Sequence, residues 1–124
     1  MSIALYIAAF LLISVGVAHS YLGERYILIR LFRREDLPKL FGGTQFTTRT
    51  LRFAWHITTI AWWGFAAILL HLAQGSISRQ VVAFAIGTTF LTTGLVTLTA
   101  SRGRHLAWPV FIAIGIISMC VGAT

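Results

Sequence analysis

The positions of its charged residues divide this chain into four apolar windows. The 124 residues include 10 Lys and Arg and 3 Asp and Glu, none of which lies within residues 3–22, 53–73, 81–100 or 106–124. Each window holds 19 to 21 residues, and about 20 helical residues cross the hydrocarbon core of a bilayer. Membrane strands need only about 10 residues of alternating polarity, which these windows do not show. The pattern predicts a single-domain, all-α integral membrane protein folded as an antiparallel four-helix bundle.

The basic residues are distributed unevenly over the three connections between these windows. Nine of the ten lie in the first and third connections, and the second holds only Arg79. Cytoplasmic loops of membrane proteins carry an excess of Lys and Arg, so both basic connections are predicted to be cytoplasmic and both termini extracytoplasmic. This topology accounts for the net charge of +7 without nucleic acid as a partner. We expect a bacterial inner (plasma) membrane location.

The first connection begins with a basic amphipathic segment. Within residues 26–34, apolar side chains such as Ile27 and Leu31 alternate with Arg30 and Arg33 at helical spacing. After a first span that ends near Gly23, such a segment is expected to lie along anionic headgroups of the lipid bilayer. Recognition of a protein partner or of a particular lipid is the alternative. No Lys or Arg precedes the first window, which favours a retained span over a cleaved signal peptide.

Small and hydroxylated residues recur in the later windows. Thr89, Thr93 and Thr97 form one stripe because they repeat every four residues. The stripe can line a polar pathway, but membrane helices use such residues mainly to approach one another closely, and we favour packing. A homo-oligomer or a place in a larger membrane complex is also expected. The single cysteine, Cys120, is predicted to be a small buried hydrophobe.

Three histidines are predicted to lie at one depth. His19, His56 and His105 fall near the cytoplasmic ends of three different windows. Neutral imidazoles arriving from separate helices suit Zn, Cu, Fe or Ni, so the three are candidate ligands of a transition metal. His71 lies fifteen residues beyond His56, about 22 Å along a helix, and belongs to the opposite surface.

Glu24 is the candidate fourth ligand of this cluster. It follows His19 by five residues, which is about 140° around a straight α-helix. Both side chains therefore face inward only if the helix is broken or overwound at Gly23. Pairing of Glu24 with Arg25 or Arg52 is the alternative.

The same histidines suit a second cofactor. Two imidazoles facing each other across a bundle can hold haem b axially, with Arg52, Arg102 and Arg104 as candidate partners of its propionates. The chain has no C-x-x-C-H sequence, so any haem would be bound non-covalently. The structural alternative is that the histidines only form hydrogen bonds within an interfacial belt that includes Trp55 and Trp108.

Three functions follow from these patterns. The first is redox chemistry or metal handling at the histidine cluster. The second is an oligomeric channel or small transporter, in which the threonine stripe lines a path and the histidines relay protons. The third is a non-catalytic subunit or assembly factor that a partner recognises through the basic loop. The sequence shows no Ser/His/Asp arrangement and no phosphate-binding glycine loop to indicate an enzyme of those classes.

Overall fold

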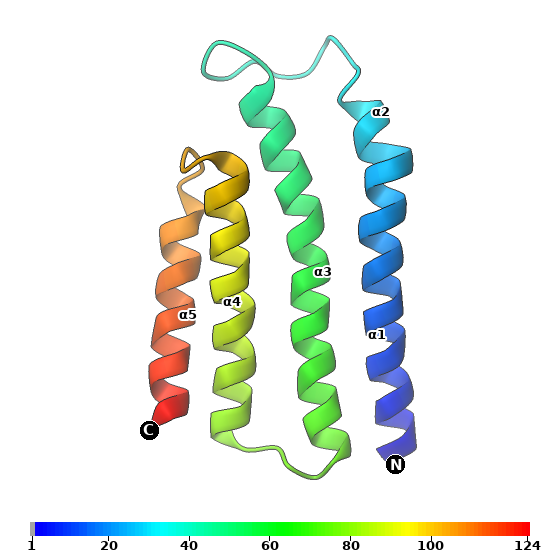
Figure 1. The fold of residues 1–124 in the computed structure, drawn as a ribbon, viewed down its shortest axis with the longest axis vertical. Helices are drawn as coiled ribbons and strands as arrows, with labels where there is room; N and C mark the ends of the chain where they lie inside the picture. Colours follow the sequence, from blue (N-terminus) through cyan, green and yellow to red (C-terminus); the bar gives the residue numbers. More distant parts are fainter. Residues whose placement is uncertain (1) are drawn as a thin grey trace.

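The computed structural model describes residues 2–124, and over this range the chain is helical with no strand. Four helical rods cross the molecule, joined by a long loop at one end, a short turn at the other and a second short turn back at the first (Figure 1). The prediction of an all-α chain with four helices is therefore confirmed. The elements are α1 (Ser2–Leu22), the π-helical stretch η1 (Gly23–Leu28), α2 (Ile29–Leu31), α3 (Gln45–Ala73), α4 (Arg79–Ser101) and α5 (Ala107–Ala123).

Three of the four rods are long and apolar enough to span a membrane. They are the continuous helix Ser2–Leu31 with 30 residues, α3 with 29 and α4 with 23. The fourth, α5, is apolar but has only 17 residues, about 25 Å at the helical rise. These lengths and compositions are those of an integral membrane protein. Helix α3 begins eight residues before the apolar window 53–73, because its polar first two turns are also helical.

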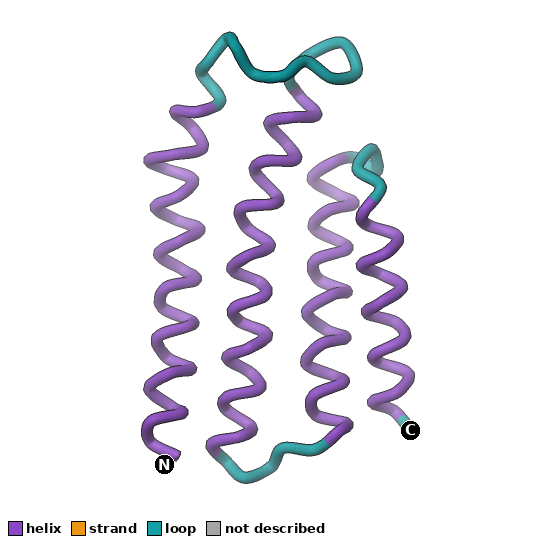
Figure 2. Tube along the Cα trace, turned by 180° about the vertical axis from the view of Figure 1, so that it is seen from behind, coloured by secondary structure: helices purple, strands orange, loops and turns teal. Residues whose placement is uncertain are grey.

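The helices stand in a row and do not close into the predicted bundle. Figures 1 and 2 show them side by side in chain order, with neighbours antiparallel. Helix α1 packs on α3, α3 on α4 and α4 on α5, and within residues 2–124 no packing joins α1 to α4 or α5. Lipid covers apolar surface as well as a neighbouring helix does, so helices of this kind associate only where specific contacts favour it.

Glycines mark the contact seams, as the small-residue pattern predicts. A Cβ placed on Gly64 of α3 would lie 2.3 Å from the Thr89 hydroxyl of α4, and one on Gly115 of α5 would lie 2.6 Å from Cγ of Leu91. Each neighbour therefore occupies the space that a larger side chain would need. The same close approach occurs at Gly16, Gly23, Gly87 and Gly94.

The basic segment after the first span differs from expectation. The helix does not end at Gly23 but continues through η1 and α2 to Leu31, and Figure 1 shows α2 in line with α1. The expected separate helix along the headgroups is therefore wrong, because the π-helical turns extend the first rod instead of breaking it. In the loop that follows, the guanidinium of Arg34 donates to both oxygens of Asp36 at 2.8 and 2.6 Å. This pairing lowers the pKa of the Asp36 carboxyl.

Cys120 also differs from expectation. It lies on an exposed face of α5 rather than in a buried position. The reason is the row itself, since α5 is the outermost helix and has α4 as its only packed neighbour among the described elements.

Candidate functional site

A chain of hydrogen bonds joins α1 and α3 near the end that carries the long loop. Nε2 of His56 lies 3.1 Å from Oε2 of Glu24, and its Nδ1 lies 2.9 Å from Oγ of Ser20. Ser20 in turn lies 2.7 Å from Oγ1 of Thr59, which donates to the carbonyl of Gly16 at 3.1 Å. The series of hydrogen bonds therefore runs from Glu24 to the Gly16 backbone carbonyl at the α1–α3 contact.

Helical periodicity explains why these side chains meet. Gly16, Ser20 and Glu24 are spaced by four residues along the first rod, so they lie on one face of it. On α3, His56 and Thr59 are spaced by three residues and share the facing side. The imidazole of His56 consequently lies between Ser20 and Glu24.

The Gly16 carbonyl, at one end of this series of hydrogen bonds, determines which group donates in each of them. The carbonyl of Gly16 can only accept, so Thr59 uses its single hydroxyl proton there. Ser20 must then donate to Thr59, and His56 must donate to Ser20 from Nδ1. A neutral imidazole with its proton on Nδ1 presents a lone pair at Nε2. Two facing acceptors do not form a hydrogen bond, so this order of donors is complete only with a further proton between His56 Nε2 and Glu24 Oε2.

Arg52 is the third member of this group. Its guanidinium contacts both oxygens of Glu24, with Nη2 2.9 Å from Oε1 and Nε donating to Oε2 at 3.2 Å. Such a two-pronged contact is the usual geometry of a guanidinium with a carboxyl group. Donation from both nitrogens of His56 is the arrangement that satisfies every contact in the group, and it is tested below. The side chains of Glu24 and His56 are each 31% exposed, so the pair is partly desolvated but can be reached from outside.

His19 lies beside this site but faces another partner. Its ring stacks on the indole of Trp55, with centroids 4.5 Å apart and planes 1° from parallel. Its Nε2 donates to the Trp55 carbonyl at 3.2 Å, and the Trp55 indole N–H donates to the His19 carbonyl at 2.9 Å. The two residues thus lock α1 to α3 reciprocally, one position before Ser20 and His56.

His105 lies on the other side of α3. It belongs to the turn between α4 and α5, where its ring packs against Phe46 and Phe53 with centroids 6.0 and 5.1 Å away. Its Nδ1 accepts the backbone N–H of Ala107 at 3.3 Å. Arg102 and Arg104 occupy the same turn and are exposed.

The predicted cluster is therefore assembled only in part. The structure brings Glu24, His56 and Arg52 together, and places His19 beside them with Nε2 already bonded. His105 is separated from this group because α3 stands between α1 and the α4–α5 pair in the row. Across residues 2–124, no three His, Cys, Asp or Glu side chains are grouped to hold a metal ion.

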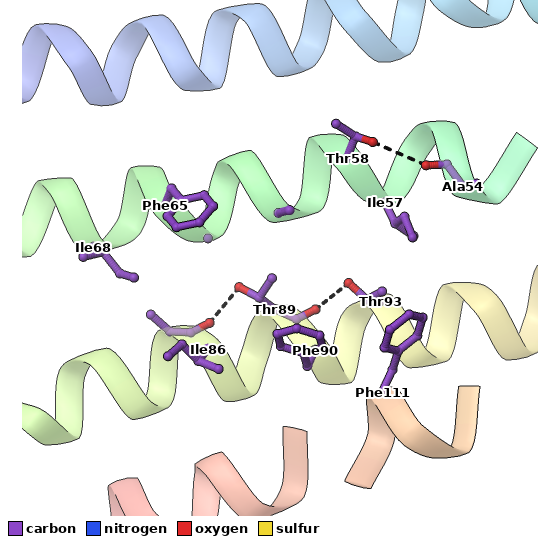
Figure 3. A pocket seen from close by; sticks show the side chains of 13 residues that line it. Ala54, Ile57, Thr58, Phe65, Ile68, Ile86, Thr89, Phe90, Thr93 and Phe111 are labelled. Atoms are coloured by element: carbon purple, nitrogen blue, oxygen red, sulfur yellow. Dashed lines mark hydrogen bonds between the residues drawn. The ribbon is translucent and has the colours of Figure 1, made fainter. Parts of the chain in front are cut away.

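The threonine stripe packs against its own helix. The hydroxyls of Thr89, Thr93 and Thr97 each donate to the carbonyl four residues earlier, at 2.7, 2.8 and 2.8 Å. Figure 3 shows the first two of these bonds at the edge of a largely apolar groove of about 450 Å³ between α3 and α4. Thr93 and Thr97 are buried. The hydroxyls are satisfied internally, which supports the packing interpretation over a polar path.

Replacing Thr93 by the isosteric valine tests this interpretation. The Thr89 carbonyl keeps its helical backbone hydrogen bond, so the free energy of unfolding should change by less than about 1 kcal/mol. Reversible unfolding in mixed micelles measures it. A loss of several times that size would mean that the hydroxyl serves a partner outside its own helix.

Ser20, Thr59 and Trp55 were not recognised as site residues from the sequence. The signal for Ser20 and Thr59 is a pair of polar spacings. Ser20 and Glu24 are four residues apart on the first rod, and His56 and Thr59 are three residues apart on the facing helix. Each residue alone resembles ordinary helix-packing material, and only the pairing of α1 with α3 gives the spacing meaning.

Comparison of the chain with protein-family models, curated proteins and solved structures gave no match in any of the three.

Proposed function

We propose that this integral membrane protein is a small transporter in which the Glu24–His56 pair takes up and releases a proton. The observation that supports the proposal is the hydrogen-bond order, which is complete only with a proton between the two side chains. Ionisable groups within a membrane span are costly and are usually kept for function. Histidine is the side chain whose charge changes near physiological pH. Arg52 and Glu24 are the charged groups that face His56.

The closed end of the chain favours a carrier over a proton channel. Beyond Thr59 the next group is the Gly16 carbonyl, which has no proton to pass on. A proton that reaches His56 therefore has no onward path through these residues and must leave by the way it came, or after a conformational change. Alternating exposure of one binding site is how carriers couple a proton to a solute.

A pH jump across supported proteoliposomes tests the proposal without a known substrate. A rapid jump from alkaline to neutral pH should displace charge as the pair takes up its proton, and Glu24→Gln should remove most of that transient because the glutamine amide offers no carboxylate. His71→Asn is the matched control, since His71 bonds only to Ser76 at the far end and its loss should leave the transient unchanged. Equal transients in wild type and Glu24→Gln would contradict the proposal.

Metal binding is the second candidate, supported by the convergence of Glu24 Oε2 and His56 Nε2. Atoms 3.1 Å apart are spaced as adjacent ligands of one ion with bonds of about 2.0 to 2.2 Å. The positive charge of Arg52 disfavours a cation at this position. His19 and His105 would have to give up existing hydrogen bonds to become further ligands. His19 and His56 would likewise have to give up theirs to hold haem b. Elemental analysis and a visible spectrum decide: a stoichiometric transition metal or a Soret band lost in His56→Ala would favour this candidate.

We also propose that the long loop and the α4–α5 turn are cytoplasmic and that α5 spans the membrane. The nine basic residues at that end support this orientation. Single cysteines in a Cys120→Ser background test it. In sealed spheroplasts, a membrane-impermeant maleimide should label Thr124→Cys and not Lys39→Cys. The reverse pattern would invert the topology. Labelling of neither cysteine would remove α5 from the membrane, and labelling of both would do so in the inverted orientation.

Self-association is a further part of the proposal. A row of four helices has two open flanks, and large apolar side chains on α5 such as Ile117, 64% exposed, are free to meet a second copy or a larger complex. Sedimentation in detergent should give a homo-oligomer. A monomer that also purifies with no partner would contradict both readings.

A further inference from the structure

A groove of about 520 Å³ follows one side of the α1–α3 pair next to the Glu24 site. It extends along the first rod from Val17 to Ile29, about 18 Å at the helical rise. Val17, Trp63 and Ile29 are among its apolar lining residues, and Ser20, Glu24 and Arg25 lie between Val17 and Ile29 along the first rod. The groove is thus largely apolar, with one basic side chain, Arg25, in its lining.

The charged groups beside the groove that remain available to a ligand are positive. The carboxylate of Glu24 is already engaged by Arg52 and His56. Arg25 and Arg30 form no ion pair with any carboxylate of residues 2–124. Their guanidinium carbons instead lie 5.8 and 5.9 Å from the centroid of one ring, that of Tyr26.

The π-helical stretch explains this convergence. Arg25 and Arg30 are five residues apart, which would direct them about 140° away from each other on an α-helix. The wider turn of a π-helix brings residues five apart closer together, and η1 (Gly23–Leu28) includes Arg25 and ends two residues before Arg30. Two guanidinium groups without a carboxylate partner therefore lie beside one tyrosine ring, and one of them, Arg25, lines the groove.

We propose that this groove binds one anionic phospholipid. The phosphate lies between Arg25 and Arg30, which offer the fork geometry that phosphate oxygens accept. One acyl chain lies along Val17 and Trp63. The site selects for an anionic headgroup because a zwitterionic lipid brings no net charge to two unpaired cations. The proposal does not depend on proton uptake by His56, since neither guanidinium touches that residue.

Binding is measured on delipidated protein in neutral detergent, by native mass spectrometry during titration with phosphatidylglycerol or phosphatidylcholine. Wild type should take up one phosphatidylglycerol with clear preference. Arg25→Gln/Arg30→Gln should weaken its binding about thirtyfold. Each basic residue near a membrane surface contributes about 1 kcal/mol of attraction to anionic lipid, and about 2 kcal/mol for the two residues corresponds to this factor. Arg102→Gln/Arg104→Gln, which removes the same charge from the same end of the molecule, should change binding by less than about twofold.

A second variant tests the apolar half of the groove. Val17 is 53% exposed, so Val17→Trp fills the groove without disturbing the core. It should weaken the binding of long-chain phosphatidylglycerol and leave the dihexanoyl form unaffected. Equal losses in the two double variants would overturn the proposal in favour of diffuse attraction. Displacement of the lipid by an equal concentration of inorganic phosphate would overturn it in favour of a simple anion site, and equal uptake of phosphatidylcholine would remove the selectivity.

Discussion

Gly23→Ala is expected to destabilise the protein by about 2 to 3 kcal/mol. A Cβ at this position would lie 2.0 Å from the Trp55 indole nitrogen, so the indole must move. Moving it breaks the bond to the His19 carbonyl and disturbs the stacked His19 ring. A loss of this size is a large fraction of the roughly 5 to 15 kcal/mol that stabilises a typical domain. Reversible unfolding in mixed micelles measures the difference.

Gly43→Ala is the matched control for this substitution. Gly43 lies in the long loop, where an added Cβ would meet nothing within 4 Å and the backbone does not require glycine. It should unfold as wild type does. If Gly23→Ala were equally silent, the α1–α3 seam would not depend on the close contact with Trp55, and the placement of the site that rests on that seam would fail.

Glu24 and His56 are expected to be energetically coupled. In a double-mutant cycle of Glu24→Ala and His56→Ala, the coupling free energy should be on the order of 1 to 2 kcal/mol in favour of the pair. This is below the range for fully buried pairs, because both side chains are 31% exposed and solvent screens them. Removing Glu24 alone should cost more than removing both, since it leaves Arg52 and His56 facing each other without their shared acceptor.

The Arg34–Asp36 pair serves as the control cycle. It has a short two-pronged geometry, but its side chains are 62% and 68% exposed in the loop, so its coupling should not be measurable. Any contribution of this pair to folding stability depends on pH because the pKa of Asp36 is lowered. The contribution is present above the usual pKa of 3.8 and is lost as the pH falls below that value. A Glu24–His56 coupling as weak as this control would mean that solvent, not the helix pairing, governs the site.

Charge-free windows were enough to predict the helices, because the length and composition of a membrane helix are set by the bilayer itself. The arrangement of those helices was harder to predict. The residues of α5 are apolar on every face of the helix. Its sequence therefore does not indicate which face meets α4, or that α1 stays apart from it. Closure into a bundle was assumed, and the row follows instead from where the glycines permit close approach.

The site was predicted in outline from the depth of its residues. Glu24, His56 and Arg52 do meet, but the break or overwinding expected at Gly23 is absent, and a wider π-helical stretch begins there instead. Depth alone cannot specify direction around the helix axis, which is why His105 was grouped with residues from which α3 separates it. The role of Ser20 and Thr59 depends on the direction of hydrogen bonds, which only the contacts between α1 and α3 reveal.

The central claim is that His56 carries a proton on each ring nitrogen, and nitrogen NMR tests it most directly. Protein labelled with ¹⁵N-histidine in lipid bilayers at neutral pH, with His56→Asn to assign the signal, should show both nitrogens of His56 protonated. Glu24→Gln should leave the proton on Nδ1 and remove the one on Nε2. An unprotonated Nδ1 in the wild-type protein would reverse the hydrogen-bond chain and contradict the account.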